Sequence, residues 1–160
     1  MITAGMIGHH ELATKREENP GRLIKDGAAY AAQIEADKKI YAEVASYKKQ
    51  GRHTEAMSEL KNVMEKYPNK SLSYVYLARL YLDEGRLADS IHNYRRAVEM
   101  EPDYVDKKAP LFIGDEVRKV VREGVEKLQR EQTLRPKDKE VGEAIKDVYY
   151  LQRRLAGGCE

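Results

Sequence analysis

Apolar and small side chains recur at intervals of three and four residues between residues 38 and 100. This is the spacing of amphipathic α-helices. In the second half of this stretch, the apolar stripe consists of Tyr74, Leu77, Tyr81, Ile91 and Tyr94. The pattern predicts four helices, over residues 38–50, 54–66, 71–84 and 88–100.

A period of 34 residues relates the first two helices to the second two. Pro68, Pro102 and Pro136 are spaced by 34 residues, and so are Gly51 and Gly85. Each glycine can adopt the left-handed conformation that ends a first helix. Pro68 and Pro102 stop the second helices because proline lacks an amide donor. Each unit is therefore expected to be a helix hairpin that buries its apolar stripe against its neighbour.

The second unit contains bulky, small and helix-breaking residues in a fixed order, namely Tyr74, Leu77, Ala78, Tyr81, Gly85, Ser90, Tyr94, Ala97 and Pro102. This order resembles the tetratricopeptide repeat. The resemblance implies an all-α fold, an α-α superhelix of antiparallel hairpins with repeats at about 37–70 and 71–104. The first repeat fits more loosely, since Glu43 stands where the family has leucine. Residues 105–136 depart from the pattern, because Pro110 falls inside the expected first helix.

The flanking segments extend this into a single helical domain over 19–156, preceded by a flexible tail at 1–18. Asn19 and Pro20 suit the start of an N-terminal helix. Asp115 is expected to cap a helix over 116–133, and Asp138 to start a last helix ending at Gly157-Gly158. These helices, within 105–156, would cap the array. The apolar patch 111–113 either inserts between helices, which we favour, or forms an exposed docking site.

Composition argues against several classes of function. The net charge is only +2 and basic pairs have acidic neighbours, so no nucleic-acid partner is expected. The lone Cys159 and the lack of a bilayer-length apolar run indicate a cytoplasmic chain without a membrane span. A removed membrane anchor would leave no trace in this sequence.

The sequence also lacks a recognisable set of catalytic groups. His53 and His92 have no carboxylate at a suitable spacing, and His9-His10-Glu11 lie in the predicted tail, where metal geometry would not be fixed. We expect no enzyme activity, no cofactor and no metal site.

The resemblance implies that first helices line a concave groove for a partner. The corresponding residues are Lys38, Tyr41, Ala45, Lys48, Lys49, Leu72, Val75, Arg79, Leu82 and Asp83, with Tyr76 at the rim. Tyrosine and arginine suit peptide binding, since arginine can hold a carboxylate through two hydrogen bonds. The alternative is that Leu72, Val75 and Leu82 pack under flanking helices and fill the groove. Tyr41 and Ala45 stand where the subclass that binds chaperone tails has lysine and asparagine, so that ligand is not expected.

These observations favour a protein-interaction scaffold or adaptor that holds a peptide or helix of a partner in this groove. The alternative is an assembly subunit that forms homo-oligomers through its C-terminal helices or the 111–113 patch.

Overall fold

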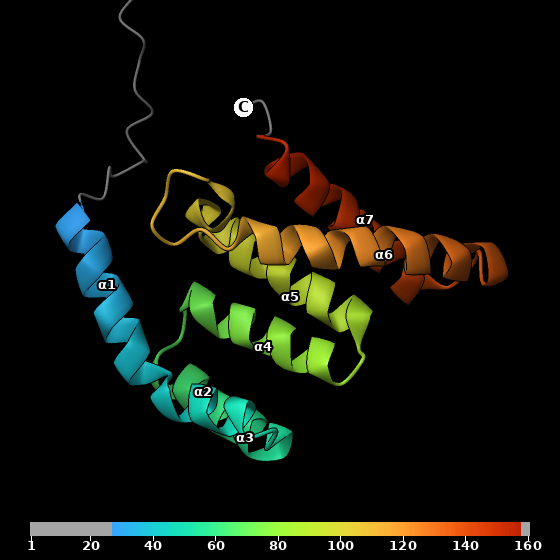
Figure 1. The fold of residues 1–160 in the computed structure, drawn as a ribbon. Helices are drawn as coiled ribbons and strands as arrows, with labels where there is room; N and C mark the ends of the chain where they lie inside the picture. The colour runs from blue at the N-terminus through green and yellow to red at the C-terminus, as the bar shows by residue number, and fades with distance from the viewer. Residues whose placement is uncertain (1–26, 158–160) are drawn as a thin grey trace, which may run out of the picture.

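The computed structural model describes residues 27–157, and this part of the chain folds into α-helices stacked in antiparallel pairs (Figure 1). In chain order the elements are α1 (Gly27–Ile40), α2 (Ala42–Lys49), α3 (His53–Lys66), α4 (Ser71–Asp83), α5 (Leu87–Met100), the 3₁₀ helix η1 (Pro102–Val105), α6 (Gly114–Leu134) and α7 (Lys139–Leu155). The hairpins α2–α3, α4–α5 and α6–α7 lie side by side in this order. No strand occurs between residues 27 and 157, and the predicted all-α class is confirmed.

The turns inside the first two hairpins are built alike. Gly51 and Gly85 have φ values of +70° and +75°, the left-handed conformation that the 34-residue spacing predicted. In the second turn, the amide of Arg86 donates to the carbonyl of Tyr81 at 2.8 Å, and the guanidinium of Arg86 lies 4.3 Å from the centre of the tyrosine ring. The first turn repeats both contacts, at 2.9 Å and 4.5 Å. Each turn thus combines a left-handed glycine with a contact between a cation and a ring.

The core consists of two clusters joined through the second hairpin. One lies between α2, α3 and α4 and includes the fully buried Leu60 and Leu80. The larger one extends from α4 to α7 and includes Ile91 and Leu151. Leu72, on α4, packs against both clusters, so the hairpins form one continuous array.

The helix predicted over residues 38–50 is divided at Tyr41 in the structure. Residues 38–40 belong to α1, and Tyr41 separates α1 from α2 with φ −99° and ψ 10°, outside the usual helical values. The backbone bonds of Tyr41 to Asp37 and Ala45 continue through this point, so it is a kink rather than a turn. Figure 1 shows α1 at a steep angle to α2. The predicted tail 1–18 and the helix start at Asn19-Pro20 lie outside the described residues, as do His9-His10-Glu11, Gly158 and Cys159.

The C-terminal helices form a third hairpin, packed on α5. Asp138 caps α7 as predicted, accepting bonds from the amides of Glu140 and Val141 at 3.0 and 3.2 Å. The predicted cap Asp115 is wrong: α6 begins at Gly114, and Asp115 lies in its first turn.

The connector before α6 contributes to the core. Leu111 and Ile113 pack against the larger cluster, and the amide of Ile113 donates to the carbonyl of Tyr104 at 2.8 Å. Gly114 is buried under the ring of Phe112, where a side chain at this position would collide with it. The patch 111–113 therefore inserts against the helices, as the favoured alternative predicted.

Candidate functional site

A hollow of about 350 Å³ opens between α2 and α4. It is lined by Ala45, Lys48, Lys49, Tyr76 and Arg79, all of which belong to the groove set predicted from the sequence. Because α2 and α4 are the first helices of adjacent hairpins, the hollow lies where the two units stack.

Tyr76 forms one wall of the hollow and is held by a second aromatic ring. The rings of Tyr41 and Tyr76 stack with centres 4.9 Å apart and 9° between their planes. Tyr41 is only 1% exposed, and its hydroxyl shares a hydrogen bond with Ser73 Oγ at 2.7 Å. Burial raises the pKa of Tyr41 to about 12, so this hydroxyl remains protonated at neutral pH. The stack fixes one face of the half-buried Tyr76 before any partner arrives.

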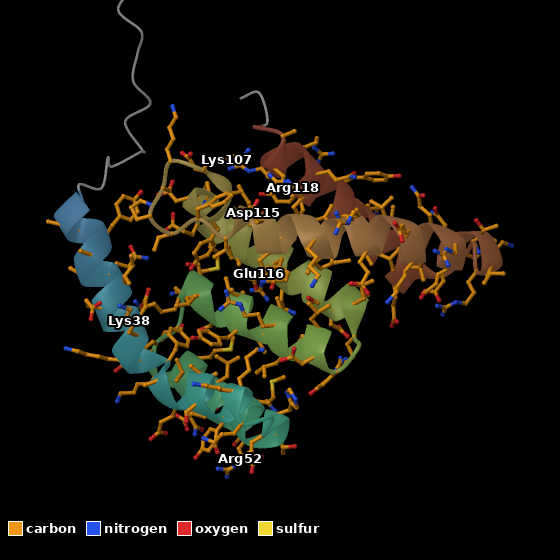
Figure 2. The ribbon with its side chains drawn as sticks, viewed as in Figure 1. Lys38, Arg52, Lys107, Asp115, Glu116 and Arg118 are labelled. Atoms are coloured by element: carbon orange, nitrogen blue, oxygen red, sulfur yellow. The ribbon has the colours of Figure 1, made fainter. Side chains whose placement is uncertain are left out.

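Arg79 already holds a carboxylate of the same chain. Its Nε and Nη2 donate to Oε1 and Oε2 of Glu116, each at 2.7 Å, and the hydroxyl of Tyr94 donates to Glu116 as well. Figure 2 shows Glu116 on the side of α6 that faces α4. Burial alone would lower the pKa of Arg79, but its hydrogen bonds and charge interaction with Glu116 outweigh this and raise it. In the same way, Arg79 keeps the pKa of Glu116 below its ordinary value despite burial.

The two lysines of the hollow differ in their surroundings. Lys48 Nζ pairs with Asp83 at 2.7 Å, and His53 Nδ1 lies 3.9 Å from the same carboxylate. Lys49 is exposed and makes no ion pair with any residue between 27 and 157. Lys49 is therefore the lining cation whose charge is available to an anionic group.

The remaining predicted residues do not line the hollow. Tyr41 and Val75 are buried in the core clusters, while Leu72 and Leu82 pack against them. Lys38 is exposed on α1 and pairs with Glu35 at 2.7 Å, away from α4 (Figure 2).

Sequence reasoning missed Glu116. Its partner Arg79 lies 37 residues earlier, and residues 105–136 keep too little of the repeat to assign Glu116 a position.

The comparison with known families agrees with this geometry. Residues 72–104, which cover nearly all of α4, all of α5 and most of η1, match the sequence pattern of the tetratricopeptide repeat. This chain carries a tetratricopeptide repeat. Tetratricopeptide repeats generally mediate protein–protein interactions. The matched repeat supplies Tyr76 and Arg79 to the hollow, and the hairpin before it supplies the other three residues. No curated protein matches the chain.

Two further observations concern other kinds of site. Between residues 27 and 157, no three histidine, cysteine, aspartate or glutamate side chains are placed so that they could hold a metal ion together. None of the described helices has both the length and the apolar character needed to cross a bilayer.

Proposed function

We propose that this protein is a non-enzymatic scaffold that binds a segment of another protein in the hollow between α2 and α4. The observation that carries the proposal is the lining itself. A pre-positioned Tyr76 ring, a Lys49 that makes no ion pair with residues 27–157, and the small Ala45 surround one open space. An aromatic ring whose conformation is already fixed loses little entropy on binding, and such rings often dominate the energy of an interface.

The lining also indicates the chemistry of the partner. The charges of Arg79 and Lys48 are matched by Glu116 and Asp83, which leaves Lys49 to meet one anionic group. The ring of Tyr76 and the methyl group of Ala45 suit an apolar side chain beside that group. The partner segment would therefore present one apolar residue and one carboxylate, rather than a run of acidic residues.

A displayed peptide library panned against the protein tests this proposal. The affinity of the selected peptides is then measured by fluorescence polarisation for the wild type and for Ala45→Glu, which places a larger, negatively charged side chain in the hollow, four residues before Lys49. Ala42→Glu is the matched control, since Ala42 is an exposed residue of the same helix and does not line the hollow.

We expect Ala45→Glu and Tyr76→Ala to weaken peptide binding at least about tenfold, the loss typical of an interface anchor, and Ala42→Glu to leave it unchanged. Equal binding by all four proteins, or a library that yields no binding peptide, would contradict the proposal.

A further inference from the structure

Glu116 contacts the lining of the hollow between α2 and α4 from outside the matched repeat. It belongs to the first turn of α6, and its carboxylate accepts two hydrogen bonds of 2.7 Å from Nε and Nη2 of Arg79, which lines the hollow. The hydroxyl of Tyr94 donates to the same carboxylate. The third hairpin therefore places a carboxylate on the lining residue that is best suited to hold an anion.

Glu116 binds Arg79 in the way that a carboxylate of a partner would. A guanidinium holds a carboxylate through two parallel hydrogen bonds, and Glu116 fills the edge of Arg79 that Nε and Nη2 form. The guanidinium has a second edge, formed by Nη1 and Nη2. A carboxylate bound there would share the guanidinium with Glu116, and the two negative charges would repel each other. Glu116 therefore weakens the attraction of Arg79 for any further carboxylate.

The charge of Glu116 also interacts with a second lining cation. Burial alone would raise the pKa of Glu116, but the hydrogen bonds and charge of Arg79 and, to a smaller extent, the charge of Lys48 lower it. Lys48 is in turn paired with Asp83 at 2.7 Å. Two cations and two carboxylates thus balance each other around the hollow, and Lys49 is the lining cation left over.

The pair lies within reach of a partner and beside the aromatic ring of the hollow. The side chains of Arg79 and Glu116 are both partly exposed, so the pair is not sealed in the core. The guanidinium carbon of Arg79 lies 5.6 Å from the centre of the Tyr76 ring. A carboxylate bound to Arg79 would therefore sit next to the ring that receives the apolar side chain of the partner.

We propose that Glu116 determines the specificity of this hollow: it occupies Arg79 as an internal ligand and thereby excludes partner segments that bring a second carboxylate beside Tyr76. The proposal rests on the proposed peptide-binding function. Loss of the Glu116 charge should convert Arg79 into a carboxylate-binding group and so widen the class of partner to doubly acidic segments. A pair that only held the third hairpin in place would change stability and leave peptide selectivity as it is.

A glutamate scan of a peptide selected by the wild type tests it. Each peptide position is replaced by glutamate in turn, and the affinity relative to the parent peptide is measured by fluorescence polarisation for the wild type, Glu116→Gln and the double variant Arg79→Gln, Glu116→Gln. For the wild type, we expect no glutamate to strengthen binding more than about threefold, the gain from one weak exposed ion pair. For Glu116→Gln, we expect at least one position to gain about tenfold, as a charge-assisted pair with a freed arginine provides. In the double variant, that gain should disappear.

Glu123→Gln is the matched control, because Glu123 belongs to the same helix and pairs with Lys127 instead of a lining residue. It should keep the selectivity of the wild type, and circular dichroism at the temperature of the binding measurement shows whether each variant is folded. A gain of about tenfold at any position in the wild type would overturn the proposal without any variant, since Arg79 would then be available despite Glu116. Equal selectivity of Glu116→Gln and the wild type would also overturn it, while the parent peptide would still bind and the proposed function would stand. A wild type that selects no peptide would remove both proposals.

Discussion

The ion pair between Arg79 and Glu116 connects the matched repeat to the C-terminal hairpin, and Glu116→Gln tests what it contributes. The substitution preserves size but removes the negative charge. It also turns an amide nitrogen toward a guanidinium that has only donors. Arg79 and Glu116 are 29% and 32% exposed, so the loss will be smaller than for a fully buried pair. With hydrogen bonds to charged groups worth roughly 1.5–3 kcal/mol, we expect a loss of about 2 kcal/mol at neutral pH. The midpoint of thermal unfolding should fall by roughly 4–8 °C.

The stability contributed by the Glu116 carboxylate should also depend on pH in a definite direction. The folded-state pKa of Glu116 is lower than its ordinary value of 4.5, so the carboxylate contributes stability that is fully present above pH 4.5. That contribution is lost as the pH falls through the lowered pKa. Burial, followed by the charge of Glu116, raises the pKa of Tyr94, so its hydroxyl remains a donor throughout this range. The stability difference between wild type and Glu116→Gln should therefore be constant from about pH 6 to 8 and shrink as the pH falls below about 4.5.

Urea unfolding followed by circular dichroism at several pH values measures this difference. Glu123→Gln is the control on the same helix, because Glu123 pairs with Lys127 at an exposed i, i+4 position and should cost no more than about 0.5 kcal/mol. The reasoning would be refuted if Glu116→Gln cost no more than this control. A difference that stays constant down to about pH 3 would equally refute it.

Three further predictions concern backbone and packing. Gly85→Ala should lower the free energy of unfolding by roughly 1–2 kcal/mol, because alanine would have to adopt φ +75°. An added Cβ meets no atom within 4 Å, so urea unfolding would measure the backbone strain without a steric clash. Ser90→Ala should leave stability unchanged or raise it, because the buried Ser90 hydroxyl has no hydrogen-bond partner among residues 27–157. The reverse change at the equivalent position of the first repeat, Ala56→Ser, should cost about 1–3 kcal/mol, and equal effects of the two substitutions would contradict this reasoning. Gly124→Ala should lower the midpoint of thermal unfolding although alanine has the better helix propensity, because the new Cβ would lie 2.6 Å from Ile91 Cδ1. A rise in the midpoint would contradict this, since it would mean that α6 shifts to accommodate the Cβ without cost.

The hairpins were predictable from sequence because their signals are local. Gly85 and Pro102 act within their own turns, so the end of α4 and the end of α5 each fell within a residue of the prediction. The kink at Tyr41 was not visible in the sequence. It accompanies burial of the Tyr41 ring against Tyr76, a contact between helices 35 residues apart in the chain.

The candidate site was predicted only in part, for a related reason. Counting positions within a repeat identified the face of α4 that carries Tyr76 and Arg79, because helix periodicity fixes which residues share a face. The same count also included Val75, which packing against neighbouring helices buries in the core. Counting repeat positions could not place Glu116, because α6 is a continuous helix without the internal turn that the repeat would require.

The pairing of the lining charges would determine how selective the proposed peptide-binding hollow is. If the lining cations had no internal partners, any acidic segment would be attracted to them. Here Glu116 and Asp83 already occupy Arg79 and Lys48, and both carboxylates would repel a second acidic residue of a partner. Lys49, which is exposed and makes no ion pair with residues 27–157, would contribute little, because an exposed ion pair is worth only about 0–1 kcal/mol and salt weakens it further. In the proposed complex, affinity would therefore come mainly from contact with the Tyr76 ring. The proposed peptides should accordingly bind almost as well at high salt as at low salt.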